Sequence, residues 1–204
     1  MSRGTSRPQF RARKSGYSRE IEKREIIQRF LIICEGEKTE PNYFRSFRVP
    51  ALVVDVEGTG ENTTSLVRRA DELRGRGDYD QVWCVFDRDS FPAQNFNAAL
   101  QMAAAKGIRV AYSNEAFELW YLLHFNYCDT ALSRDQYGGK LRTLLGRPYL
   151  KNDSTMFEAL YTRLDAALRN ARHLRNSYDP HTPCDDNPCT TVFELVEQLR
   201  RFAN

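Results

Sequence analysis

Long apolar runs are absent from the 204-residue sequence. No stretch approaches the roughly 20 apolar residues that a transmembrane helix needs, so we expect no membrane partner. The N-terminal residues are basic and rich in Ser, Gly and Pro, without the apolar segment of a secretory signal, which predicts a cytoplasmic protein. The five cysteines are odd in number and scattered, so they predict no disulfide framework.

The sequence contains an incomplete phosphate-binding motif and an incomplete zinc-binding motif. The loop Glu57-Gly-Thr-Gly-Glu-Asn62 lacks the Gly-Lys-Ser/Thr ending of a P-loop and the spacing of a dinucleotide fingerprint, so a loop that caps the next helix is favoured. His181, Cys184 and Cys189 do not follow a recognised zinc spacing, and a fourth ligand is missing. Zinc is therefore not favoured, and metal binding by either cysteine stays an open question.

Charge is distributed unevenly along a chain that can otherwise fill a globular core. Hydrophobic residues make up 41% of the sequence, with 12 Phe and 10 Tyr. Residues 1–29 hold nine Lys or Arg and three Glu, a net charge of +6, so the remainder of this +3 chain carries −3. A basic arm suits the phosphates of a nucleic acid, although a solvated tail explains it equally well.

Apolar runs alternate with amphipathic stretches between residues 30 and 125. The expected strands are Phe30–Cys34, Ala51–Val56, Gln81–Phe86 and Ile108–Tyr112. The expected helices are Pro41–Phe47, a helix from Thr63 or Thr64 to Arg74, Asn95–Lys106 and Glu115–Phe125. Apolar strands that alternate with helices predict an α/β fold, with a mostly parallel sheet of about four strands covered by helices on both faces.

We divide the sequence into three parts: a basic flexible tail at 1–24, an α/β core at 25–127, and a mostly helical extension at 128–204 that packs on the core. Residues 128–152 are rich in loop signals such as Gly138-Gly139. Two helical stretches follow at Ser154–Asn176 and Thr191–Phe202. Asn187-Pro-Cys-Thr190 is interpreted as a turn and N-cap before the last helix.

Acidic residues follow three of the four expected strands. Glu35 comes after the first strand and Asp87 and Asp89 after the third, while the fourth leads to Glu115 and Glu118. The carboxyl ends of parallel strands lie at one edge of a sheet, so these groups are expected to converge. Converging carboxylates repel one another, and Mg²⁺ or Mn²⁺ removes that conflict. Single acidic residues often mark strand ends, but together these favour a metal site.

Other polar residues near this edge have two interpretations each. Glu115 and Glu118 are three residues apart, so they share a face if both are helical. His124 is a candidate general base, but helical spacing places it on the apolar side, which favours a structural histidine. Lys140 and Lys151 are candidates for stabilising a phosphoryl transition state, whereas surface lysine is the default expectation.

Four stretches resemble the RloB family: "CEGEKTEPNYF", "VFDRD", "SNEAFELWYLLHF" and "NPCTTVFELV", which together span residues 34–196. A strand followed by Glu-Gly, and a later strand ending in Asp-x-Asp, also resemble the Toprim domain, a Rossmann-like metal-binding fold shared by topoisomerases, primases and OLD-family nucleases. Ser90 stands where a glycine often follows the Toprim Asp-x-Asp. That exchange affects the expected loop geometry rather than the ligands.

The resemblance implies roles for particular residues. Glu35 matches the Toprim glutamate, which is a metal ligand or general acid/base, and Asp87 and Asp89 match the metal-binding Asp-x-Asp. The candidates for holding a second ion, as in OLD-like nucleases, are Glu40, Glu115 and Glu118. The resemblance also implies a bacterial protein of phage defence, abortive infection or restriction systems, with an AAA/ABC-type ATPase as a partner.

The leading hypothesis is therefore a divalent-metal-dependent nuclease acting on DNA or RNA, tRNA included, in which Glu35, Asp87, Asp89 and Glu118 bind metal and Glu115 joins them in catalysis. The alternative is a non-catalytic nucleic-acid-binding or regulatory subunit of the ATPase. Nucleotidyl transfer, as in primases, is a third and weaker hypothesis. The sequence does not predict the oligomeric state.

Overall fold

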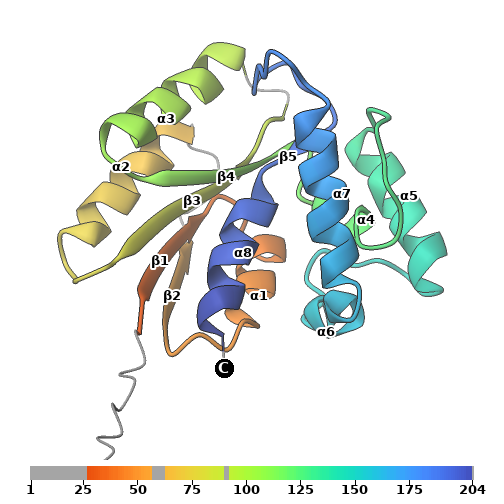
Figure 1. Cartoon of the computed structure of the whole chain (residues 1–204), viewed down its shortest axis with the longest axis horizontal. Helices are drawn as coiled ribbons and strands as arrows, with labels where there is room; N and C mark the ends of the chain where they lie inside the picture. Colours follow the sequence, from red (N-terminus) through yellow and green to blue (C-terminus); the bar gives the residue numbers. More distant parts are fainter. Residues whose placement is uncertain (1–26, 57–62, 90–91, 204) are drawn as a thin grey trace, which may run out of the picture.

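The computed structural model describes residues 27–56, 63–89 and 92–203, so the expected basic tail, the loop at 57–62 and Ser90 lie outside the described residues. Five strands form one sheet in the order β2-β1-β3-β4-β5 (Figure 1). The first four are parallel, and the last runs antiparallel to β4. Their bounds are β1 (Arg29–Cys34), β2 (Ala51–Val56), β3 (Gln81–Asp87), β4 (Arg109–Asn114) and β5 (Cys189–Thr190).

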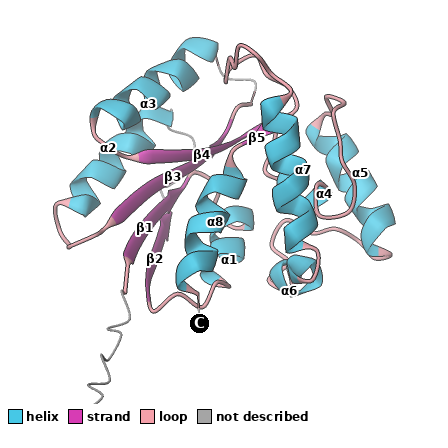
Figure 2. Cartoon of the chain, viewed as in Figure 1, coloured by secondary structure: helices cyan, strands magenta, loops and turns pink. Residues whose placement is uncertain are grey.

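Helices connect and cover these strands, which confirms the predicted α/β fold with a mostly parallel sheet (Figure 2). No helix in the described ranges has the length and apolar character needed to cross a bilayer. The helices are α1 (Thr39–Arg45), α2 (Thr63–Arg74), α3 (Ala93–Ala105), α4 (Glu118–Leu122), α5 (Arg134–Leu145), α6 (Met156–Tyr161), α7 (Leu164–Asn176) and α8 (Val192–Phe202).

Alternate residues of the central strands face two separate apolar layers. Leu31 and Ile33 of β1 belong to a layer with α2 and α3, whereas Phe30 and Ile32 face a larger layer. The larger layer includes residues of α1 and of α4 to α8, so the helices after residue 128 share a core with the sheet. Figure 1 shows α2 and α3 on one face of the sheet and α1 and α8 on the other.

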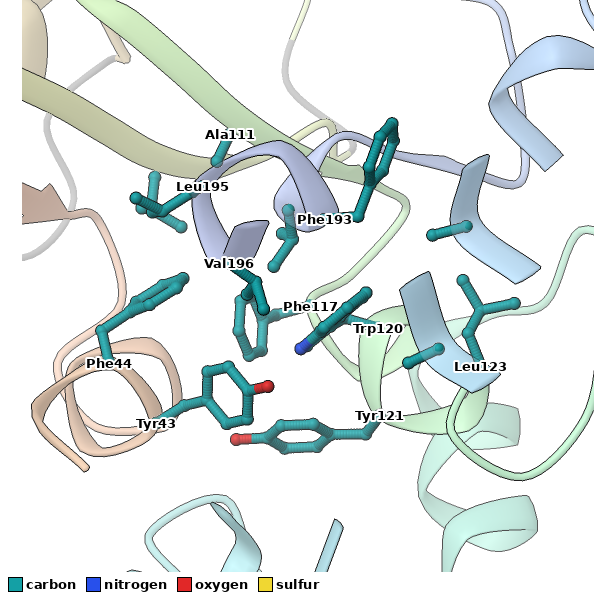
Figure 3. Packing of buried hydrophobic residues seen from close by; sticks show 14 of the residues in the cluster. Tyr43, Phe44, Ala111, Phe117, Trp120, Tyr121, Leu123, Phe193, Leu195 and Val196 are labelled. Atoms are coloured by element: carbon teal, nitrogen blue, oxygen red, sulfur yellow. The ribbon is translucent and has the colours of Figure 1, made fainter. Parts of the chain in front are cut away.

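An aromatic cluster joins α1 to α4 within the larger layer (Figure 3). The ring of Tyr43 lies 5.8 Å from that of Phe117 and 6.4 Å from that of Trp120, both edge-on. The ring centres of Phe117 and Tyr121 are 5.3 Å apart. Such pairs contribute about 0.5–1.5 kcal/mol each beyond the burial of their area. The cluster therefore fixes the two helices that carry Glu40 and Glu118.

One expectation for the region before α6 was wrong. Residues 128–152 were expected to be loop-rich, but α5 crosses Gly138-Gly139. Its N-terminus has a capping box, in which Ser133 accepts from the Gln136 amide. Tyr137 and Leu141 are buried on its inner face, and this packing outweighs the low helix propensity of two glycines. Gly146, with φ of 67°, ends the helix.

Three boundaries also differ from the expected ones. The predicted helix Ser154–Asn176 is divided into α6 and α7. The strand expected to end at Tyr112 continues to Asn114, because Asn114 pairs with Cys189 of β5, and α4 consequently begins only at Glu118. The segment interpreted as a turn before α8 thus contains β5, a two-residue strand too short to leave a periodic signal.

Candidate metal centre

The sheet changes its direction of growth between β1 and β3, and open α/β sheets bind ligands at the carboxyl ends of strands beside such a point. Glu35 directly follows β1, and Asp87 is the last residue of β3. The Glu35 amide donates to the Val85 carbonyl over 2.9 Å, so parallel pairing continues one residue past β1. This pairing places Glu35 and Asp87 on neighbouring strands, at the carboxyl-terminal edge of the sheet.

Glu40 reaches this edge from the first turn of α1 by folding back over Gly36. A Cβ added at Gly36 would lie 2.6 Å from Cδ of Glu40 and 2.7 Å from its Oε1, which is closer than non-bonded atoms come. An added Cβ would therefore displace the Glu40 carboxylate, and glycine permits its close approach to the backbone. Only 7% of Glu40 is exposed.

Glu118, the first residue of α4, is 5% exposed and has two polar neighbours. The Tyr149 hydroxyl donates to its Oε1 over 3.0 Å, and Nζ of Lys151 lies 3.9 Å from the same oxygen. The carbonyl of Lys151 in turn accepts from the Thr39 hydroxyl over 2.9 Å. These contacts connect the segment after α5 to both α1 and α4.

The electrostatics show that these carboxyl groups form one cluster. Burial raises the pKa of Glu35 to about 6, and the charge of Asp89 adds to the effect. Burial raises the pKa of Glu40 to about 7, with further contributions from Glu118 and Glu35. The pKa of Asp87 lies well above its ordinary value because of burial and the charge of Glu40. Negative charge is thus concentrated where solvent screens it poorly.

A cation from α5 lies between two of the carboxylates. Nη2 of Arg134 is 3.3 Å from Oδ2 of Asp87 and 3.3 Å from Oδ2 of Asp89. Its side chain is 40% exposed, whereas those of Asp87 and Asp89 are 15% and 21% exposed. Sequence reasoning missed Arg134, as it missed Tyr149, because both come from the stretch expected to be loop-rich. No local signal connects a residue of α5 to the end of β3.

A model of the RloB-like protein family matches residues 30–199. The chain belongs to the RloB-like family. The matched range is most of the chain, contains the whole carboxylate cluster, and confirms the family resemblance seen in the sequence. Neither a curated protein nor a solved structure matches the chain.

The RloB-like chain buries His124 away from the cluster, as the structural interpretation predicted. His124 is 1% exposed, its Nδ1 lies 2.9 Å from the Trp120 carbonyl, and its ring packs edge-on against that indole. Burial lowers the pKa of His124 to about 4, so the ring is neutral at physiological pH. Its buried Nε2 has no hydrogen-bond partner. These contacts are those of a core residue rather than a general base.

Glu115 does not lie as expected, whereas Lys140 is an exposed residue, as the default expectation for it predicted. Glu115 precedes α4, so the helical face that it was predicted to share with Glu118 does not exist. Burial raises the pKa of Tyr137 in α5, and the charge of Glu115 adds to the shift. Lys140 lines a separate cavity of about 610 Å³, together with Leu122. Among the two candidate lysines, it is therefore Lys151 that lies beside the carboxylates.

The donor atoms of the cluster suit a hard divalent cation. Mg²⁺ binds through one or two carboxylates and keeps several waters, so not every acidic group has to bind it directly. Among the possible metal ligands throughout the described part of the chain, one set of three ligand atoms lies within 4.8 Å of one another. This set is outside the carboxylate cluster, in His181, Asp186 and Cys189. No three carboxylates of the cluster meet this spacing among the described residues, so direct contact with one or two of them, completed by water, fits an ion better than a set of three. Arg134 already provides positive charge between two of them.

Proposed function

We propose that the carboxylate cluster binds Mg²⁺ or Mn²⁺ and hydrolyses phosphodiester bonds in nucleic acid. The observation that carries the proposal is the concentration of Glu35, Glu40, Asp87, Asp89 and Glu118 at the point where the sheet changes direction. Buried like charges are costly, and the raised pKa values of three of these groups express that cost. A divalent cation offsets it, which supports a metal site more strongly than a structural role.

The residues divide into binding and proton-transfer roles in this proposal. Asp87 and Asp89 hold the ion, with Glu35 or Glu118 completing its protein ligands. The ion, when bound, supplies a water of lowered pKa and neutralises charge on the phosphate. Glu35, whose pKa is about 6, changes protonation near neutral pH, so its carboxylate is suited to accept a proton from the attacking water.

Two cations at the site would bind the substrate. The side chain of Lys151 is 64% exposed and that of Arg134 is 40% exposed, so both reach solvent beside the carboxylates. A divalent ion on Asp87 and Asp89 would release Arg134 from its ion pairs. The guanidinium would then pair with a phosphate, for which its planar donors are well matched.

The family assignment supplies the wider context of the proposal. An RloB-like protein with a Toprim-like site fits a nuclease of bacterial phage defence that works with an AAA/ABC-type ATPase. Residues 1–29, with a net charge of +6, would add affinity for DNA or RNA through their contacts with phosphates. A regulatory subunit that binds nucleic acid without cutting it would use the same basic residues but would not depend on Asp87.

The test is cleavage of plasmid DNA and total tRNA by the purified protein in Mg²⁺ or Mn²⁺, with and without the AAA/ABC-type ATPase proposed as its partner. We expect Asp87→Ala and Glu35→Ala to lower cleavage at least about 100-fold, as losses of a metal ligand or general base do. The matched control is Glu37→Ala, since Glu37 is exposed in the same turn. Unchanged cleavage in Asp87→Ala would refute the proposed site. Binding without cleavage under every condition would favour the regulatory role, and nucleotide polymerisation would favour a transferase.

A further inference from the structure

The connection between α7 and β5 gathers three metal-ligand side chains that the proposed nuclease site does not use. His181 and Asp186 lie in this connection, and Cys189 begins β5 (blue in Figure 1). One ligand atom from each lies within 4.8 Å of the other two. An imidazole, a carboxylate and a thiol therefore surround one point.

Contacts with β4 fix the positions of the carboxylate and the thiol. Asp186 is 5% exposed, and its Oδ2 accepts from the Thr182 amide over 2.9 Å. Its main-chain oxygen accepts from Nδ2 of Asn114 over 2.8 Å. Cys189 is fully buried and pairs with the same Asn114 in the sheet. Both ligands are thus held by the end of β4 rather than by a free loop.

The imidazole meets the carboxylate without a hydrogen bond. Nδ1 of His181 is in ion-pair contact with Oδ2 of Asp186, yet this buried nitrogen makes no hydrogen bond. The other ring nitrogen, Nε2, lies 3.0 Å from the hydroxyl of Tyr112. The Tyr112 hydroxyl can donate to Nε2 or accept from it, so either a proton or a metal ion can lie between Nδ1 and the Asp186 carboxylate.

A cysteine nucleophile activated by histidine is the other use of such residues, and the geometry does not support it. Cys189 is inaccessible, and its Sγ faces the Tyr112 hydroxyl at 3.8 Å. Burial raises the pKa of the Cys189 thiol to about 11, which leaves little thiolate to react. A metal ion, in contrast, binds the thiolate directly and compensates its charge.

We propose that His181, Asp186 and Cys189 bind one Zn²⁺, with a solvent molecule as the fourth ligand. Sulfur, nitrogen and oxygen in one set suit Zn²⁺, whereas the all-oxygen cluster suits Mg²⁺ or Mn²⁺. With metal–ligand bonds of about 2.0–2.1 Å and a tetrahedral angle, Nδ1 and Oδ2 would be about 3.3 Å apart. Binding of an ion by both atoms would therefore require the His181 and Asp186 side chains to stand further apart than they do without it. The candidate set in the sequence was His181, Cys184 and Cys189, whose spacing did not favour zinc; the structure places Asp186, rather than Cys184, beside His181 and Cys189.

An ion at this position supports the proposed nuclease site without belonging to it. Nε of Arg88 donates to the Cys184 carbonyl over 3.1 Å, and Arg88 lies between Asp87 and Asp89 in the chain. The Arg88 amide also donates to the Ser113 carbonyl over 2.8 Å. Zinc binding would thus fix the connection between α7 and β5, and through Arg88 it would stabilise the turn that positions Asp87 and Asp89.

The test uses Co²⁺ as a spectroscopic substitute for Zn²⁺ in the full-length protein after chelation. We expect one equivalent of Co²⁺ to give a near-ultraviolet thiolate-to-cobalt charge-transfer band and the visible absorption of a four-coordinate ion, both removed by added Zn²⁺. Cys189→Ser and His181→Gln should lose the charge-transfer band. Cys184→Ser is the matched control and should keep it. Zn²⁺ should raise the melting temperature of the wild type and the control only.

The absence of a charge-transfer band in the wild type would overturn the proposal, as would a band that survives in Cys189→Ser. Because Cys189 is buried, its variant could fail to fold, and His181→Gln, at a half-buried position, then decides the outcome. An Asp87→Ala, Asp89→Ala double variant should retain the band. The zinc site can thus be confirmed or refuted whether or not the nuclease proposal is correct.

Discussion

Replacing Glu40 with glutamine should stabilise the metal-free protein at pH 8 and change it little at pH 5. Glu40 is almost fully buried, and burial raises its pKa from 4.5 to about 7, with the charges of Glu118 and Glu35 adding to the shift. The folded protein therefore holds a proton on Glu40 that the unfolded chain releases at lower pH. Glutamine keeps the shape of the side chain and removes the charge.

The sign and size of the effect follow from the two pKa values. Between pH 4.5 and about 7 the folded state binds more protons than the unfolded state, so the free energy of unfolding falls as pH rises. Above pH 7 the folded protein has lost all of the stability that the proton on Glu40 provides. At 1.36 kcal/mol per pKa unit, the shift from 4.5 to about 7 makes this loss about 3 kcal/mol. At pH 5 the same relation gives less than about 1 kcal/mol. For a chain of this size, 3 kcal/mol corresponds to roughly 6–12 °C in Tm.

The assay is urea unfolding of EDTA-treated protein at pH 5 and pH 8. Glu37→Gln is the matched control. Glu37 is exposed, so its replacement should leave the free energy of unfolding unchanged at pH 5 and at pH 8. Excess Mn²⁺ at pH 8 should stabilise the wild type more than Glu40→Gln, since the ion offsets the same repulsion. Equal stability of wild type and variant at pH 8, or an equal gain at both pH values, would refute the reasoning.

Three further substitutions test other contacts. Gly36→Ala should weaken Mn²⁺ binding about 10-fold in calorimetry, because the added Cβ displaces the Glu40 carboxylate. Arg134→Ala should strengthen Mn²⁺ binding about 5-fold in an electron paramagnetic resonance titration, because a competing cation leaves Asp87. His124, whose pKa falls to about 4, stays neutral while the unfolded chain takes up a proton below pH 6.5, so stability falls as pH drops. In urea unfolding, His124→Gln should lose that slope.

Each of these substitutions has a control within the chain. Gly139→Ala adds a Cβ with nothing within 4 Å, and Arg142 and His173 are exposed residues of α5 and α7. Wild-type Mn²⁺ affinity in Gly36→Ala would show that Glu40 does not help to hold the ion. Weaker binding in Arg134→Ala would mean that the guanidinium supports the ion rather than competing with it. An unchanged slope in His124→Gln would assign the titration to another group.

The sequence predicted the parts of the fold that have a local signal. The four parallel strands are short apolar runs with polar boundaries, and their order along the chain already indicates that their carboxyl ends meet. The helix α5 lacked such a signal, because Gly138-Gly139 weakens its propensity and its stability comes from buried Tyr137 and Leu141. The strand β5 exists through pairing with a strand that lies about 75 residues earlier in sequence.

The same distinction applies to the candidate site. Glu35 and Asp87 could be predicted because each directly follows or ends a strand. Arg134 contacts Asp87 although 47 positions separate them in the sequence, and no sequence motif predicts that contact. Glu115 was misplaced because the helix was expected to begin before Glu118, whereas pairing with β5 prolongs β4 to Asn114. Long-range contacts thus decide which of the acidic residues meet.

The aromatic core explains how the fold keeps repelling carboxylates together. Tyr43 contacts six aromatic rings, on α1 itself and on the segments packed against it. At about 0.5–1.5 kcal/mol each, several such pairs are comparable to the roughly 3 kcal/mol that charging Glu40 costs. The helix α1 therefore cannot relieve the repulsion by moving away, and Glu40 responds through its pKa instead. Tyr43 lies three residues after Glu40, on the same face of α1, so its aromatic contacts fix the backbone that carries this acidic group.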